Sequence, residues 1–146
     1  MKDNQALIVV DVQKDFLETG ALPVKDGSQV VPVINRISPK FKHVVFTQDW
    51  HPQGHISFAS SHSGEAPYST IDIPYGKQVL WPEHCVQNTT GAEFADGLNT
   101  ENGDCFVKKG AHSDIDSYSA FLEADRKTKT DLGVWLKSQG ITEVFV

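Results

Sequence analysis

Four short apolar segments contain or end in charged residues, and each is typical of a strand that is buried on both faces of a parallel sheet. They are Ala6–Asp11, His43–Asp49, Asp104–Lys109 and Thr142–Val146, the last of which coincides with the end of the sequence. The spacing of these segments leaves room for helical crossovers between consecutive strands.

Two amphipathic helices are predicted between the strands. The first follows from apolar residues at helical spacing, with Ser28 as its N-terminal cap: Val30, Val33, Ile34, Ile37 and Phe41. The second is marked by Leu132, Trp135 and Leu136, with capping residues in 128–131 and Gly140 in the left-handed position after its end. Alternating strands and helices indicate right-handed βαβ units and an α/β fold with three αβα layers around a central parallel sheet.

The segment Trp50–Asn102 has a different character. It is rich in Pro, Gly, Ser and His and shows little periodicity. Long irregular segments inside a compact domain are more often functional than idle, so we expect this one to contribute to a site.

Composition narrows the class of protein. The 146 residues include 13 Lys and Arg and 19 Asp and Glu, so the net charge is −6. This acidic balance argues against a nucleic-acid partner. The longest apolar run, Ala6–Val10, is far shorter than the roughly 20 residues of a membrane helix. The N-terminal residues lack the build of a secretory signal. We therefore expect one cytoplasmic domain with no nucleic-acid or membrane partner, and a homo-oligomer is left open.

Three charged residues lie where the predicted strands end. Asp11, Asp49 and Lys109 follow the first three strands, and ligands of open parallel sheets bind at the carboxyl ends of the strands. A single charge at a strand end is usually just solvated. Three that share one edge of the sheet indicate a candidate site.

A metal site is a second candidate. Asp49 and His51 are two residues apart, so in an extended segment their side chains point the same way, and His84 is the natural third ligand. One carboxylate and two imidazoles suit Zn²⁺, Fe²⁺ or Mn²⁺ and leave positions open. His55 is either a fourth ligand or a residue that orients the segment through hydrogen bonds.

Neither cysteine is a convincing nucleophile. Cys85 follows His84 directly, but adjacent side chains of an extended chain point to opposite faces, so the imidazole could not easily activate the thiol. Cys105 lies within a predicted strand and is expected to be a buried small apolar residue.

The motifs as a set resemble the nicotinamidases of the isochorismatase-like cysteine hydrolase superfamily. The resemblance extends over essentially the whole chain and rests on these segments: Ala6–Phe16, Thr47–Pro52, His55–Phe58, Trp81–Gln87, Lys108–Gly110 and Asp116–Phe121. The pair Asp-Trp-His-Pro and Trp-Pro-Glu-His-Cys-Val separates nicotinamidases from their metal-free relatives.

The resemblance implies hydrolysis of nicotinamide to nicotinate and ammonia in NAD salvage. It implies that Asp11 moves a proton between a cysteine thiol and the leaving ammonia, and that the charge of Lys109 favours the thiolate. One divalent ion held by Asp49, His51 and His84 would receive the pyridine nitrogen of the substrate. The substrate slot would be lined by Phe16, Trp81 and Tyr118.

The sequence departs from this family at its end. The family's nucleophile lies in a Gly-x-x-x-Asp-x-Cys-Val segment after the fourth strand, and residues 1–146 stop within that strand. We therefore expect an isochorismatase-like domain that lacks its C-terminal strands and helices and is inactive alone, as the N-terminal part of an active nicotinamidase. The alternatives are another hydrolase of the superfamily and a non-catalytic metal-binding remnant.

Overall fold

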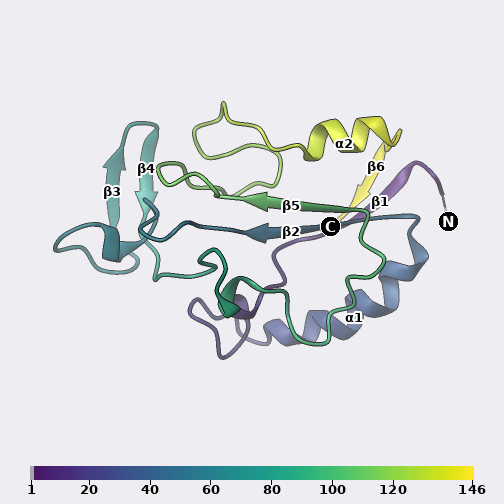
Figure 1. Cartoon of the computed structure of the whole chain (residues 1–146), viewed down its shortest axis with the longest axis horizontal. Helices are drawn as coiled ribbons and strands as arrows, with labels where there is room; N and C mark the ends of the chain where they lie inside the picture. Colours follow the sequence, from purple (N-terminus) through teal and green to yellow (C-terminus); the bar gives the residue numbers. More distant parts are fainter. Residues whose placement is uncertain (1) are drawn as a thin grey trace.

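The computed structural model describes residues 2–146, and its centre is a four-stranded, wholly parallel sheet of order β5-β2-β1-β6 (Figure 1). The strands are β1 (Gln5–Val9), β2 (His43–Asp49), β5 (Cys105–Lys109) and β6 (Glu143–Phe145). All four predicted strands are confirmed, although β1 ends two residues before Asp11. The carboxyl ends of β1, β2 and β5 share one edge of the sheet, remote from the N-terminus.

One helix covers each face of the sheet, as Figure 1 shows, so the predicted αβα layering is confirmed. Alternate residues of each strand point to opposite faces. On one face Leu132 and Leu136 of α2 (Leu132–Ser138) pack in a core with Ile8 and Val45. On the other face α1 (Val30–Ile37) packs with Leu7, Val9, Val44 and Phe46.

The ends of the two helices differ from the predictions. The side chain of Ser28 does not cap α1; its hydroxyl donates a hydrogen bond to Glu18 (2.9 Å), and Gln29 is the N-cap residue. Phe41 lies beyond α1, after a 3-10 turn at Ser38–Lys40. Gly140 has φ +67°, which confirms its left-handed position after α2.

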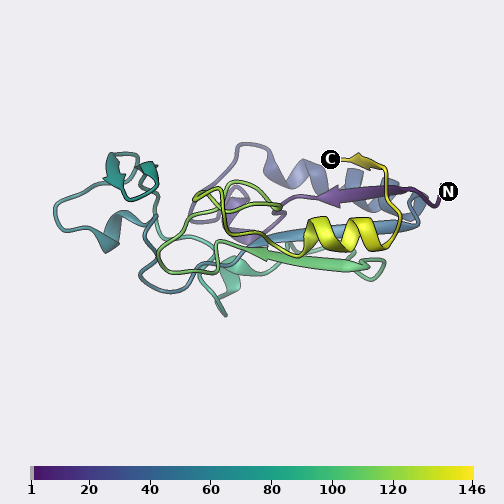
Figure 2. The same cartoon turned by 90° about the horizontal axis from the view of Figure 1, so that it is seen from above.

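The segment predicted as irregular contains regular structure that the pattern did not indicate. It holds the antiparallel hairpin of β3 (Thr70–Ile73) and β4 (Gly76–Val79), which stands apart from the sheet at the end of the molecule remote from the termini (Figures 1 and 2). β3 alternates polar and apolar residues, but over only four positions, and β4 has a single apolar residue, Val79. The pattern is therefore too short to indicate the hairpin. Short 3-10 turns complete the described chain: Lys14–Phe16, Gly27–Gln29, Ala59–Ser61 and Thr90–Ala92.

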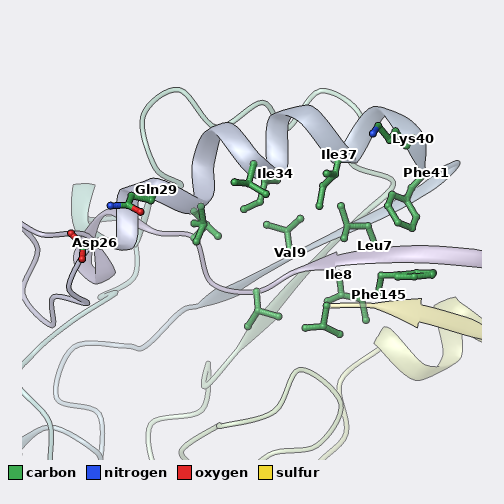
Figure 3. Close-up of a pocket in the computed structure, with 15 residues that line it drawn as sticks. Leu7, Ile8, Val9, Asp26, Gln29, Ile34, Ile37, Lys40, Phe41 and Phe145 are labelled. Atoms are coloured by element: carbon green, nitrogen blue, oxygen red, sulfur yellow. The ribbon is translucent and has the colours of Figure 1, made fainter.

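A large apolar cavity of about 810 Å³ lies between α1 and the edge of the sheet formed by β1 and β6. Figure 3 shows Ile34 and Ile37 of α1 facing Leu7 and Val9, with Phe145 near one end. All three residues of β6 are exposed. Within residues 2–146, no helix is both long enough and apolar enough to cross a membrane.

Candidate active site

Three ionised side chains converge at the carboxyl edge of the sheet. The ammonium group of Lys109, the last residue of β5, lies 2.8 Å from Asp11 Oδ2 and also contacts Asp49 Oδ1. All three side chains are largely buried, so the pairing offsets the cost of removing charges from water. The three strand-end charges that the sequence singled out are therefore brought together.

Asp11 is held in an unusual backbone conformation. Its φ is +49°, and its backbone N–H donates to the carbonyl oxygen of Thr47 (3.2 Å). The hydroxyl of Thr47 donates to Asp11 Oδ1 (2.5 Å), so one carboxylate oxygen faces Thr47 and the other faces Lys109. Burial raises the pKa of Asp11 above its ordinary value, an effect larger than the opposing charge of Lys109.

Asp49 experiences the opposite balance. Burial alone would raise its pKa, but the imidazole of His51 and the charge of Lys109 outweigh burial and lower the pKa to about 2. For Lys109, burial disfavours the ammonium form, and the two carboxylates more than compensate and raise its pKa. The two carboxylates next to one ammonium group thus differ, since Asp49 is the stronger acid and Asp11 the stronger base.

Two imidazoles approach Asp49 from the side opposite Lys109. The Nε2 atoms of His51 and His84 lie 3.7 and 3.8 Å from Asp49 Oδ2. Each ring places its Nδ1 atom against a backbone carbonyl, Gly110 O for His51 (2.9 Å) and Pro82 O for His84 (2.8 Å). Because a carbonyl only accepts, Nδ1 carries a proton in each ring, and Nε2 is the nitrogen that can bind an ion in the space beside Asp49 when the ring is neutral.

These three donors fit a divalent metal ion. Their ligand atoms all lie within 4.8 Å of one another, and carbonyl groups that fix the second nitrogen of a histidine are typical of metal sites. Burial lowers the pKa of His84, which keeps its lone pair free at neutral pH. For His51, burial would lower the pKa, but the Asp49 carboxylate attracts a proton on the ring and raises it. A bound cation would take the place of that proton.

His55 stacks on His51, with ring centroids 4.2 Å apart, but both of its nitrogens have other partners. Its Nε2 donates to the carbonyl of Ile115 (3.0 Å), which leaves Nδ1 to accept from the hydroxyl of Ser57 (2.7 Å). A second group of three possible ligands, His51, His55 and Asp116, would require those bonds to break. Of the two roles left open for His55, orientation through hydrogen bonds therefore fits the geometry better.

The charged groups and the imidazoles open onto one small pocket of about 210 Å³. Its lining combines the five residues described above with further aromatic, apolar and polar side chains: Phe16, Leu22, Trp81, Asp116, Ser117 and Tyr118. All eight candidate site residues from the sequence line this pocket. Within the described residues, neither cysteine lines it, and burial raises the pKa of the Cys85 thiol. Cys105 is half-buried beside the core under α2, less enclosed than predicted.

Residues 5–146 match the Isochorismatase domain family over almost the entire chain. The chain belongs to this family. Among its relatives is a nicotinamidase of Acinetobacter baylyi, 51% identical over 99% of this chain and 67% of the relative.

Solved structures agree with this assignment to the isochorismatase family. A nicotinamidase/pyrazinamidase of Acinetobacter baumanii has a TM-score of 0.96 at 50% identity, covering 99% of this chain and 70% of that one. A pyrazinamidase of Pyrococcus horikoshii in complex with zinc has a TM-score of 0.74 at 39% identity, covering 97% and 68%.

Sequence reasoning missed residues that hold this isochorismatase-family site together. The amide of Gln13, fully buried, accepts from the backbone N–H of Asp49 and donates to the carbonyl of Asp49 (both 2.8 Å). Asp15 Oδ2 accepts from the backbone N–H of Cys85 (2.7 Å), next to His84. Gln13 and Asp15 both lie inside the motif Ala6–Phe16. Polar residues directly after a buried strand in that motif were the sequence feature that could have indicated a role for them.

Proposed function

We propose that this chain carries the acid–base and metal-binding half of a nicotinamidase, which converts nicotinamide and water to nicotinate and ammonia. The observation that carries the proposal is the convergence on one pocket of the Asp11–Lys109 pair and the donor set of Asp49, His51 and His84. The pocket is smaller than those that take drug-sized ligands, which fits a single-ring substrate. The relatives named nicotinamidase support the choice of amide.

Asp49, His51 and His84 would hold one divalent ion, either zinc, iron or manganese. When bound, the ion would offer an open position to the ring nitrogen of nicotinamide and withdraw charge from the ring. The pyrazinamidase that was solved with zinc supports a metal of this class. The Asp49 carboxylate would interact with both the ion and Lys109, because Oδ2 faces the two histidines and Oδ1 contacts the ammonium group of Lys109.

Asp11 and Lys109 would supply the proton chemistry. The raised pKa of Asp11 makes its carboxylate a better proton acceptor, so it can take the proton of an attacking thiol and later deliver it to the leaving ammonia. Lys109 lies beside Asp11 and would stabilise the thiolate electrostatically. A planar amide ring would lie between aromatic walls formed by Phe16, Trp81 and Tyr118.

We place the nucleophilic cysteine in the part of the relatives that residues 1–146 do not match, since these residues span about two thirds of the relatives' length. Residues 1–146 alone would then bind metal and nicotinamide but release no ammonia. We further place the protein in the cytoplasm, as a step of NAD salvage, and leave open whether it forms a homo-oligomer. Residues 1–146 would form part of one isochorismatase-like domain.

The experiment compares two proteins, the 146-residue chain and a longer form that continues through a cysteine after β6. We expect ammonia release from nicotinamide only from the longer form. The activity should disappear with a chelator and return with zinc, manganese or iron. No turnover by the metal-loaded longer form would refute the proposal, and turnover that survives Asp49→Ala would favour a metal-free hydrolase of the same superfamily.

A further inference from the structure

The β3–β4 hairpin has one side chain that differs from its neighbours. Gln78, on β4, is only 2% exposed, whereas Gly76 and Lys77 on the same strand are exposed. The hairpin lies beyond the carboxyl ends of β2 and β5, close to the site end of the sheet (Figures 1 and 2). A buried amide must find hydrogen-bond partners, and two of those of Gln78 lie in a different segment of the chain.

One partner of Gln78 is local, because its Nε2 atom donates to the carbonyl of the adjacent Val79 (2.7 Å). The other two are residues of the segment 116–118. The same Nε2 atom lies 2.7 Å from Asp116 Oδ2 and 3.3 Å from the hydroxyl of Tyr118. The backbone N–H of Asp116 also donates to the hydroxyl of Tyr75, in the turn of the same hairpin (3.0 Å). The hairpin therefore contacts this segment through both a side chain and the turn.

The segment 116–118 forms one wall of the candidate active site. All three of its residues line the pocket of about 210 Å³, and the carbonyl of Ser117 accepts from the ammonium group of Lys109 (3.2 Å). The hydroxyl of Tyr118 also accepts from the indole N–H of Trp81 (3.1 Å), which joins two aromatic residues of the pocket. Gln78 lies behind this wall, in a separate groove of about 660 Å³ that Tyr118 also lines.

We propose that Gln78 is a positioning residue, which holds the wall formed by Asp116, Ser117 and Tyr118 at the distance that a planar aromatic amide requires. The inference rests on the proposed function for the substrate class. Gln78 does not line the active-site pocket itself, so it acts on the ligand only through Asp116 and Tyr118. It sets affinity for the ring, while the ion pair between Asp11 and Lys109 involves no residue of this wall.

The test measures nicotinamide binding to the zinc-loaded 146-residue chain by tryptophan fluorescence, which needs no nucleophile. Gln78→Leu keeps the side chain close in size but removes its donors, and we expect the Kd for nicotinamide to rise about tenfold. Tyr75→Phe removes only the hydroxyl behind Asp116, and we expect a rise of about threefold. Lys77→Gln is the matched control, because among the described residues its exposed side chain pairs only with Asp72, within the hairpin, and its Kd should equal that of the wild type.

Exchanging the amide and the carboxylate between positions 78 and 116 distinguishes a loss of positioning from a general loss of stability. Gln78→Glu places a second carboxylate against Asp116 and should weaken binding at least as much as Gln78→Leu. Adding Asp116→Asn restores a donor and an acceptor at this contact and should recover most of the affinity. In the longer, active form, Gln78→Leu should raise KM about tenfold and change kcat less than threefold.

The outcomes distinguish this inference from the proposed function. If the metal-loaded wild-type chain does not bind nicotinamide, the proposed function fails and this inference fails with it. If the wild type binds and a folded Gln78→Leu variant binds equally well, the inference alone is overturned. If Gln78→Leu does not fold by circular dichroism, Tyr75→Phe decides, and an unchanged Kd in that variant overturns the inference.

Discussion

The sheet edge and the long segment Trp50–Asn102 bring side chains to the same pocket in different ways. Asp49 and Lys109 end strands that pair with each other, so the backbone ladder itself sets their separation. His51 and His84 lie outside the sheet, and single hydrogen bonds to the carbonyls of Gly110 and Pro82 fix their rings. In the proposed function, the regular region together with Asp11 would supply the proton chemistry, and the irregular region would supply most of the metal ligands. The two functions should be separable by mutation.

The largest expected effect comes from Asp11→Asn in the longer, active form. Loss of the proton acceptor should lower ammonia release by about 10³-fold, within the range of general-base catalysis. Metal content should stay at one ion per chain, because Asp11 is not among the proposed ligands. The matched control is Asp26→Asn, an exposed aspartate that also has a positive φ (+59°). Joint loss of metal and activity in Asp11→Asn would contradict the separation.

The complementary change is His84→Ala in the long segment. We expect zinc affinity to fall by more than about 100-fold, because the loss of a histidine's supporting partner alone costs 10–100-fold at metal sites. Equilibrium dialysis of the 146-residue chain measures this. His62→Ala, which lies outside the cluster, is the control and should bind zinc normally. Unchanged affinity in His84→Ala would remove this residue from the ligand set.

The pH dependence of stability tests the packing of His55 against the proposed metal ligand His51. Burial and the neighbouring His51 lower the pKa of His55 from 6.5 to about 4. The unfolded chain therefore binds a proton first as the pH falls, so this contribution to stability is complete above pH 6.5 and is lost between 6.5 and 4. The pKa difference corresponds to about 3 kcal/mol.

Urea unfolding of the metal-free chain at several pH values measures this effect. The free energy of unfolding of the wild type should fall over that interval, and His55→Gln should show a flatter dependence. Equal slopes for the two proteins would show that His55 is not the titrating group.

The smallest effect is expected from Gln13→Leu, which breaks a contact between the 11–15 segment and the end of β2. Two backbone groups of Asp49 would lose buried partners, at a cost of about 2 kcal/mol in the free energy of unfolding. Urea denaturation measures it, with the exposed Gln139→Leu as the control. A loss no larger than that of the control would mean that water replaces the amide.

The strands and the charged residues at their ends could be predicted because burial on both faces leaves a continuous apolar run in the sequence. Asp11, Asp49 and Lys109 follow from that pattern together with the rule for parallel sheets. The parts that could not be predicted depend on contacts between distant segments. The bond from Gln78 to Asp116 spans 38 residues and the bond from Cys85 to Asp15 spans 70, and no local periodicity records either of them.

Gly110, directly after Lys109, shows how tightly the two regions are joined. Its φ is +61°, and a Cβ atom built on it would lie 2.4 Å from Cε1 of His51. Its carbonyl also orients that same ring. Even an alanine at this position would displace an imidazole and force an unfavourable backbone angle at once. In a Gly110→Ala variant, the proposed metal ion should therefore dissociate faster than in the wild type, even under conditions where the chain still unfolds cooperatively.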